Sequence, residues 1–219
     1  MAEFLLLVAV FAVWFGFTKL KQNLLYRLRS GQNAGERAVS RRVDFHALGS
    51  QGHLLKNVTL PFEDGTTQID HILIDSKGIF VIETKDYEGW LFGDEHARQW
   101  TQVLYGQKRK FQNPLHQNHR HVRAIRCWLD FIPPQQIHAV VVFAGEGRFK
   151  SGIPPGVLYK SQINAFLRSF PEGVISLEDQ QRCLHSLQAN RLAVSPETDR
   201  KHQAYLAQKH GKRSDWFRF

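Results

Sequence analysis

The sequence predicts an α/β fold, with a mixed central sheet flanked by helices and an N-terminal transmembrane helix. Three observations predict it. Short apolar strands at residues 54–60, 68–75, 79–85 and 138–144 alternate with segments of helical periodicity. The chain has 219 residues, of which 42 % are hydrophobic, enough for one domain with appendages. Residues 4–17 form an apolar run at the extreme terminus.

The apolar run, FLLLVAVFAVWFGF at residues 4–17, contains no polar side chain. A bilayer core takes about 20 apolar residues as a helix, with about 17 as the lower limit. A cleaved signal peptide would carry its charge before such a run, whereas here the basic stretch from Lys19 to Arg29 follows it. Positive charge on that side favours a cytoplasmic C-terminal side. We expect a single-pass anchor in the inner membrane at residues 1–20, N-out with the folded domain cytoplasmic, and a basic juxtamembrane linker at 21–31.

The folded domain is expected at residues 32–160, and its elements follow from periodicity and turn residues. In chain order, the predicted elements are a helix at 34–48, strands at 54–60, 68–75, 79–85 and 90–92, a helix at 115–130, and strands at 138–144 and 157–159. The strand at 138–144 is apolar throughout, as expected of a strand buried on both faces. Residues 161–194 are expected to form a helical extension. Residues 195–219 form a basic polar tail. Its end, from Lys209 to Phe219, could contact anionic lipid or nucleic acid, but disorder is the simpler interpretation.

Three charged residues interrupt the apolar strands. Asp70 lies within Gln-Ile-Asp-His-Ile, and Glu83 and Lys85 lie two residues apart in the next strand. Burying a carboxylate is costly unless it is paired or bound to a cation. Since strand side chains alternate between faces, Glu83 and Lys85 share one face. These residues therefore need an explanation, either structural or functional.

The face that Asp70 occupies depends on the turn between the two strands. If Lys77 and Gly78 form a two-residue loop, Asp70 lies opposite Lys85, with Glu83 diagonal to it on the same face. A three-residue loop turns Asp70 to the other face. A shared site therefore requires a particular register.

Two carboxylates and a lysine on one face suit phosphodiester hydrolysis. Carboxylate oxygens hold a hard cation such as Mg²⁺ or Mn²⁺. Such a cation neutralises charge on the phosphate and lowers the pKa of its bound water. The alternative interpretation is a structural salt bridge between Lys85 and one acid.

The string QIDHILIDSKGIFVIETKDYEGWLFG, preceded by Gly35-Glu36 and followed by Asn113-Pro114-Leu115-His116-Gln117, resembles the nuclease-related domain (NERD) family. The resemblance covers about residues 32–144. That family is similar to PD-(D/E)xK nucleases, so the resemblance implies a restriction-endonuclease-like core and nuclease chemistry.

The resemblance also implies roles for individual residues. Asp70 and Glu83 would be the metal ligands, with the Thr84 carbonyl as a third. Glu36, on the first helix, would point toward the metal, although an acid in a first turn is also favoured by the helix dipole alone.

Two further residues complete the implied catalytic set. Lys85 would be the catalytic base or would stabilise charge. Gln117 would face the site from the second long helix. The alternative interpretation of Gln117 is a residue on a solvated helix face.

A net charge of +9 and a pI near 9.8 suit contact with a polyanion. We expect a nucleic-acid groove built from basic residues interleaved with aromatic ones such as Trp90, Trp100, Tyr105 and Phe111. Its predicted basic residues are Lys108, Arg109, Lys110, Arg120 and Arg123. A plain solvated surface is the alternative interpretation.

His116, His119 and His121 are close in sequence, but nothing nearby completes a tetrahedral zinc set, so a basic helix face or plain surface is favoured. Cys127 and Cys183 are interpreted as two buried, reduced thiols.

The leading functional hypothesis is a membrane-anchored, divalent-metal-dependent nuclease acting on DNA (or RNA). The alternative is a catalytically silent nucleic-acid-binding module tethered at the membrane. A third hypothesis is a membrane-tethered scaffold in which the carboxylates serve structure alone.

Overall fold

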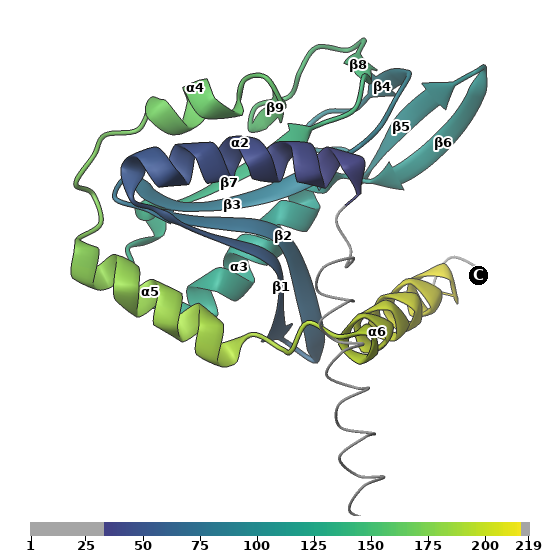
Figure 1. Ribbon diagram of the computed structural model, residues 1–219. Helices are drawn as coiled ribbons and strands as arrows, with labels where there is room; N and C mark the ends of the chain where they lie inside the picture. The colour runs from purple at the N-terminus through teal and green to yellow at the C-terminus, as the bar shows by residue number, and fades with distance from the viewer. Residues whose placement is uncertain (1–32, 216–219) are drawn as a thin grey trace, which may run out of the picture. The chain divides into compact units, whose positions relative to one another are not determined.

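The computed structural model describes the chain from residue 33 to residue 215 (Figure 1). The chain divides into two units, one comprising residues 32–192 and the other residues 1–31 with 193–219. The predicted anchor at 1–20 and linker at 21–31 lie outside the described residues. Within the described part, no helix is long and apolar enough to cross a bilayer.

The first unit is built on a five-stranded sheet with strand order β1-β2-β3-β7-β9. The strands are β1 (His53–Phe62), β2 (Gly65–Asp75), β3 (Gly78–Lys85), β7 (Ile137–Phe143) and β9 (Val157–Tyr159). The pairs β1–β2 and β2–β3 are antiparallel, whereas β3–β7 and β7–β9 are parallel. The predicted mixed central sheet is confirmed. β7 lies between two strands, and its predicted burial is confirmed for Val140 to Phe143.

Helices cover both faces of this sheet (Figure 1). They are α2 (Ala34–Ser50), α3 (Pro114–Trp128), α4 (Ile163–Arg168) and α5 (Leu177–Asn190), with a short 3₁₀ turn at Pro134–Gln136. Val39 and Val43 of α2 pack with Phe80 of β3 and residues of α4, whereas Ile125 of α3 and Leu187 of α5 pack against the opposite face. The sheet is therefore the middle of three layers.

Local sequence explains where the two long helices beside the predicted catalytic residues begin. Asn33 caps α2, its side-chain Oδ1 accepting from the Glu36 N–H at 2.8 Å. Asn113 caps α3 by accepting from the Leu115 N–H at 2.9 Å, and Pro114 follows at the first helical position. Both helix starts are thus fixed by short-range chemistry that the sequence displays.

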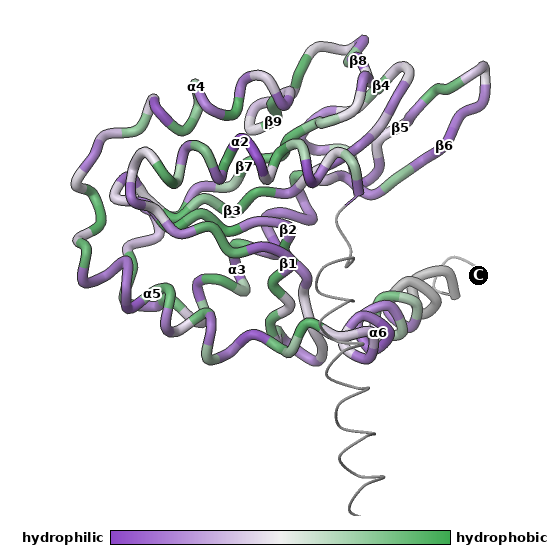
Figure 2. The backbone as a smooth tube through the Cα atoms, in the orientation of Figure 1, coloured by the Kyte–Doolittle hydropathy of each residue, from purple (hydrophilic) through white to green (hydrophobic). Residues whose placement is uncertain are grey.

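A second, four-stranded sheet has the order β6-β5-β4-β8. Its strands are β4 (Trp90–Phe92), β5 (Gln99–Leu104), β6 (Gln107–Gln112) and β8 (Arg148–Phe149). Only β4 was predicted. The β5–β6 hairpin turns at Tyr105 and Gly106, which have φ of 49° and 78°, as a two-residue turn of type I′ requires. Exposed charge masks the periodicity of β6, seen as a mostly hydrophilic strand in Figure 2.

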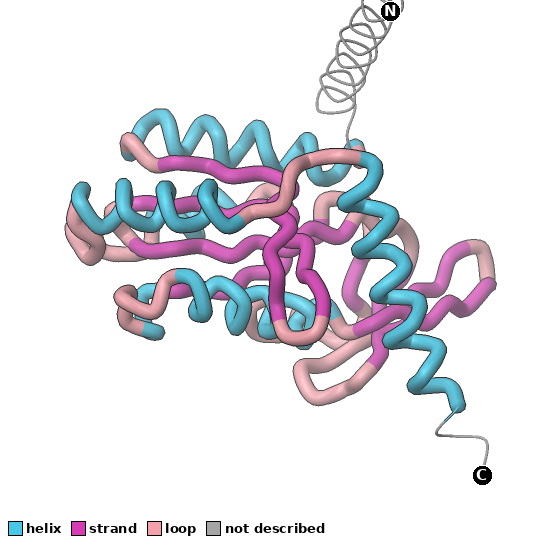
Figure 3. Tube along the Cα trace, turned by 90° about the horizontal axis from the view of Figure 1, so that it is seen from below, coloured by secondary structure: helices cyan, strands magenta, loops and turns pink. Residues whose placement is uncertain are grey.

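Two sequence expectations need correction. β1 continues through Pro61, which is tolerated because β1 is an edge strand of the sheet. Disorder at the end of the tail is wrong for residues 209–215, which belong to α6 (Pro196–Asp215), a polar helix of the second unit with Glu197 and Asp199 in its first turn (Figure 3). Within residues 161–194, a loop containing Pro171 and Gly173 separates the helices α4 and α5.

Candidate active site

The turn between β2 and β3 differs from the predicted one, but Asp70 keeps its predicted face. Asp75 pairs with Gly78 and His71 with Ile82, so the two-residue loop is Ser76-Lys77. Extending this register by one residue places Asp70 opposite Glu83 rather than opposite Lys85. The partner moves by two residues, which preserves the face because side chains alternate with period two.

Lys85 is held between one side chain of β3 and one side chain of α3. Its Nζ lies 2.6 Å from Glu83 Oε1 and donates to Gln117 Oε1 of α3 at 3.0 Å. Burial lowers the pKa of the Lys85 ammonium, but attraction to Glu83 outweighs it and holds the pKa above its usual value. Lys85 is therefore protonated, and Gln117 faces the site as the resemblance implied.

Glu83 is nearly inaccessible to solvent and has a partner on each carboxylate oxygen. Oε1 binds Lys85, and Oε2 lies 3.0 Å from His121 Nε2. Burial raises the pKa of Glu83, yet Lys85 and His121 together bring it below its usual value. Glu83 is the central anion of a group of residues that we call the cluster: Glu36, Asp70, Glu83, Lys85, Gln117 and His121.

His121 is a site residue that the sequence reasoning missed. Its second ring nitrogen, Nδ1, hydrogen-bonds Thr67 Oγ1 at 2.8 Å, so the buried imidazole connects Thr67 to Glu83. The available signal was its spacing of four from Gln117, which puts both on one face of α3. His116 points elsewhere, its Nε2 lying 2.9 Å from the Glu95 carbonyl.

Asp70 accepts the Thr84 backbone N–H at Oδ2, at 2.7 Å, which leaves Oδ1 outside that bond. Burial, and then repulsion from Glu83 and Glu36, raise the pKa of Asp70 well above its usual value. The carboxylate thus sits among like charges with one backbone donor. This is the electrostatic situation that a bound cation would relieve.

Glu36 joins the cluster from the start of α2. Burial raises its pKa to about 7 against a lowering hydrogen bond, with smaller contributions from Glu83, Lys85 and Asp86. Its Oε1 accepts from Asn33 Nδ2 at 2.8 Å. Glu36 is therefore both an acid in the first turn of α2 and an electrostatic neighbour of Glu83 and Lys85, so the two interpretations of this residue are compatible.

Gly35 explains how α2 comes this close. Its N–H donates to Asp86 Oδ2 at 2.9 Å, and a Cβ at position 35 would lie 2.6 Å from Asp86 Cγ. Any side chain here would push the helix start away from the end of β3. The adjacent Glu36 would move with it.

The oxygen donors suit a hard divalent cation. Asp70 and Glu83 face one side of the sheet, and the pKa values of Asp70 and Glu36 are raised first by burial and then by repulsion from the neighbouring acids. Among the described residues, no three His, Cys, Asp or Glu side chains form a preassembled metal-binding group. Backbone carbonyl and water oxygens would complete the shell, as is common for Mg²⁺.

The predicted basic groove is not assembled as one surface. Lys108, Arg109 and Lys110 lie exposed on β6. Arg120 and Arg123 of α3 bind Glu63 in the β1–β2 turn, at 3.4 and 3.0 Å, and lie over the Phe62 ring. In Figure 1 that turn lies at the lower edge of the unit and the β5–β6 hairpin at its upper right.

The expected aromatic platforms also divide. Trp100 is 1 % exposed and packs in the core, with Phe111 packed against it. Trp90 and Tyr105 are 54 % and 92 % exposed. These last two are the most exposed of the four predicted stacking residues, whereas Phe111 is partly buried.

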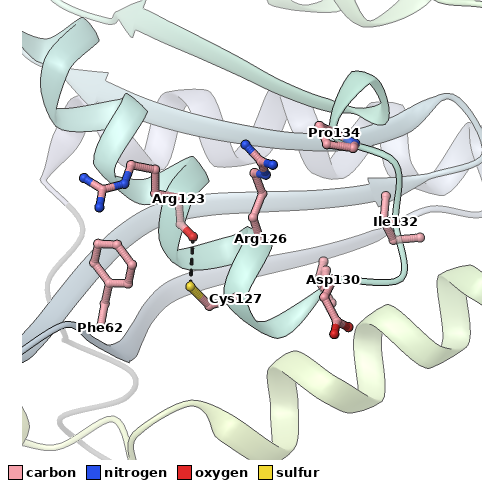
Figure 4. Close-up of a pocket in the computed structure, with 8 residues that line it drawn as sticks. Phe62, Arg123, Arg126, Cys127, Asp130, Ile132 and Pro134 are labelled. Carbon is pink, nitrogen blue, oxygen red and sulfur yellow. Dashed lines mark hydrogen bonds between the residues drawn. The ribbon is translucent and has the colours of Figure 1, made fainter.

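A surface pocket of about 390 Å³ lies at the C-terminal half of α3 (Figure 4). Its lining includes Phe62, Arg123 and Arg126. Cys127 also lines it, with Sγ 3.4 Å from the Arg123 carbonyl; this thiol is exposed rather than buried as predicted, whereas Cys183 is buried. None of the acidic residues of the cluster lines it. The pocket and the cluster are separate features.

Comparisons with known proteins agree with the geometry. The profile of the family described as "Nuclease-related domain" (NERD) matches residues 31–144, which include every member of the cluster. An uncharacterised protein of Bacillus anthracis is 35 % identical over 191 residues, covering 82 % of this chain and 85 % of the relative. No solved structure matches.

Proposed function

The chain belongs to the nuclease-related domain family, and we propose that it is a divalent-metal-dependent nuclease that hydrolyses phosphodiester bonds in DNA (or RNA). The observation that carries the proposal is the convergence of five residues. Asp70, Glu83 and Lys85 share one face of the sheet, and Glu36 and Gln117 reach them from helices on its two faces. In this proposal the five-stranded sheet and its helices form a restriction-endonuclease-like core.

Asp70 and Glu83 are the proposed ligands of Mg²⁺ (or Mn²⁺), with the Thr84 carbonyl as a third. When bound, the cation supplies charge neutralisation at the phosphate and a more acidic water. Asp70 can offer its Oδ1 oxygen to the cation, because the Thr84 N–H binds only Oδ2.

Lys85 acts in this proposal through charge rather than as a base. Its raised pKa keeps the ammonium protonated at neutral pH, and a general base must be deprotonated to accept a proton. Held by Glu83 and Gln117, the ammonium is fixed where it can stabilise a phosphate oxygen. Glu36, with a pKa of about 7, is the better proton acceptor.

One observation favours the alternative function, a silent nucleic-acid-binding module. Both oxygens of Glu83 already have partners, Lys85 and His121. If those contacts do not rearrange around a cation, the cluster remains a structural ion-pair network on a basic protein. Binding without cleavage would then be the function.

The test uses the full chain in detergent, incubated with single- and double-stranded DNA and RNA. Mg²⁺, Mn²⁺ and EDTA arms run beside Lys85→Ala, with Lys160→Ala as the matched control because Lys160 forms an exposed pair with Glu146. Cleavage that needs metal and Lys85, but not Lys160, supports the nuclease. No product from folded protein in any arm supports the silent module.

A membrane location is proposed from the sequence of residues 4–17 and the basic residues after it. The folded domain would then act on nucleic acid near the cytoplasmic surface of the inner membrane. Resistance of the full chain to carbonate extraction, with a C-terminal tag protected from external protease in spheroplasts, supports this location. Release by carbonate contradicts it.

A further inference from the structure

The four-stranded sheet has two unlike faces. Leu91 and Trp100 of one face are buried and pack with Phe143 of the larger sheet. The neighbouring strand residues Trp90 and Phe92 point the opposite way, and they are 54 % and 38 % exposed. Two large aromatic side chains thus stand in solvent on a well-supported sheet.

Strand register assigns cations to the same exposed face. Trp90 pairs with Arg148 on one side and Val103 on the other, and Val103 pairs with Lys108. Phe92 pairs with Thr101, which pairs with Lys110. Paired residues of adjacent strands lie on one face. We call the set Trp90, Phe92, Lys108, Lys110 and Arg148 the aromatic–basic face.

Arg109 provides a contrast within the same strand. It pairs with Gln102, a neighbour of Trp100 on the core-facing side of the alternation, and so points away from the aromatic–basic face. Lys108, Arg109 and Lys110 are all exposed. The structure thus separates three consecutive cations that the sequence presents as a single basic run.

The face is held in shape before any ligand arrives. The positive φ of Tyr105 and Gly106 gives the hairpin the turn that matches strand twist. Lys150 Nζ lies 4.9 Å from the centroid of the Trp90 ring, a cation–π contact that orients the indole and adds a positive charge beside it. A ligand therefore meets a preorganised surface.

The charged strand residues of the aromatic–basic face are all positive. None of the strand residues that the register assigns to it is acidic. In the adjoining β4–β5 loop, Asp94 Oδ1 accepts from the backbone N–H groups of His96 and Ala97, and Glu95 lies 3.2 Å from His96. Cations around exposed aromatic rings complement a polyanion that also presents flat apolar surfaces.

We propose that the aromatic–basic face binds single-stranded nucleic acid, with bases stacked on Trp90 and Phe92 and phosphates on the surrounding lysines and arginine. A duplex hides the faces of its bases, whereas an unpaired strand exposes them to aromatic side chains. The inference rests on the proposed function, since it names the substrate class of the same enzyme: strands with unpaired bases.

The face is close enough to serve the cluster. Trp90 is five positions after Lys85 in the chain, so their Cα atoms are at most about 18 Å apart. Backbone bonds tie this segment down, with Tyr87 O accepting from Gly147 and Gly89 O from Arg148. The segment that joins the two regions is therefore short and fixed, so the face and Lys85 are held at a limited separation.

The experiment measures binding, not cleavage. The full chain carrying Lys85→Ala is titrated in detergent and EDTA with a labelled single-stranded oligothymidine, and separately with a duplex of the same length. Trp90→Ala is compared with Tyr105→Ala. Tyr105 is the most exposed aromatic residue of the described chain and lies in the β5–β6 turn, outside the residues that define the face. The Lys108→Ala/Lys110→Ala pair is compared with Arg109→Ala.

We expect Trp90→Ala to weaken single-strand binding about tenfold, within the range for loss of one stacked base, and Tyr105→Ala to change it less than about twofold. The double lysine variant should reduce the slope of log affinity against log salt by about 1.4, near 0.7 for each phosphate contact. Arg109→Ala should leave the slope within about half of one contact. Duplex binding should be weaker and insensitive to Trp90.

Two results would overturn the inference: equal losses in Trp90→Ala and Tyr105→Ala, or the same Trp90 dependence with duplex. A third would reassign the face to lipid: Trp90 and lysine variants that lose phosphatidylserine-dependent vesicle binding while keeping oligothymidine affinity. Failure of the proposed nuclease is distinguishable, because a wild-type chain that cleaves nothing leaves this binding assay intact.

Discussion

The two sheets of this protein differ in the burial of their charged residues. In the five-stranded sheet, Glu83 is 2 % exposed, and its carboxylate is paired with Lys85 and contacted by the His121 ring at 3.0 Å. In the four-stranded sheet, Lys108 and Lys110 stand in solvent, and no acidic strand residue shares their face. Electrostatic interactions are strong in the first setting and screened in the second.

The contrast assigns different tasks to the two regions. A buried cluster of like charges costs stability and shifts pKa values, which suits chemistry on a bound phosphate. Exposed cations cost little and attract a polyanion in a salt-dependent way. Substitutions in the five-stranded sheet should therefore change cleavage, and substitutions in the four-stranded sheet should change nucleic-acid binding.

The largest effect is expected for Glu83→Gln. Removing this charge leaves Lys85 without its 2.6 Å partner and removes a proposed metal ligand, so cleavage should fall at least about 1000-fold. Nucleic-acid binding in EDTA should stay within about threefold, because it belongs to the other sheet. Glu63→Gln, which removes an acid paired with arginines in the β1–β2 turn, is the matched control. Equal loss in both variants would contradict the division of tasks.

His121→Ala is expected to have the next largest effect. The imidazole contacts Glu83 and Thr67 without itself being a proposed ligand, so it is a positioning residue whose loss should lower cleavage about 10- to 100-fold. The effect should appear in kcat and in the metal concentration needed, and His121→Gln should restore part of it. His116→Ala, whose histidine contacts only the Glu95 carbonyl, serves as control. Unchanged metal dependence would argue for a purely structural role.

Asp70→Asn should stabilise the metal-free protein. Burial and the nearby acids raise the pKa of Asp70, so its charge opposes folding at neutral pH, while an amide oxygen can still accept from Thr84 N–H. We expect a gain of roughly 1 kcal/mol, the size typical of single substitutions, together with lost cleavage. Thermal unfolding should also show that Mg²⁺ stabilises the wild type and not the variant. A destabilised Asp70→Asn would indicate that the carboxylate serves structure.

The smallest effect concerns pH. Burial raises the pKa of Glu36 from 4.5 to about 7 in the folded state. A raised folded-state pKa means that stability is fully present below pH 4.5 and is lost as pH rises toward 7. Relative to Glu36→Gln, the wild type should therefore lose stability over this window, by less than roughly 1 kcal/mol because the side chain is partly exposed. Parallel pH profiles for the two proteins would show that Glu36 is not coupled to the cluster.

Some of the site could be predicted because it is local. Alternation places Glu83 and Lys85 on one face whatever the partner strand does. Asn33 and Asn113 are the N-cap residues of the two helices that carry Glu36 and Gln117. Both helices were predicted within two residues of their observed ends, since capping residues act over a single turn.

Other parts could not be predicted because they depend on contacts far apart in the chain. His121 reads as one of three nearby histidines until α3 packs on the sheet and brings it to Glu83 and Thr67, 38 and 54 residues away. The β5–β6 hairpin has little strand signal in β6, and pairing with β5 supplies the order. The predicted basic groove is divided for the same reason, because Arg120 and Arg123 form ion pairs with Glu63.

The sequence alone determined the family, the α/β class, the mixed sheet and the pairing of Glu83 with Lys85 on one face, since periodicity and short motifs carry that information. The tertiary structure decided which charges are buried together and which are exposed. It placed Asp70 opposite Glu83, recruited His121, and split three consecutive cations of β6 between two faces. Burial and charge proximity arise from packing between distant segments, and these set the pKa values and the reach of each charged group.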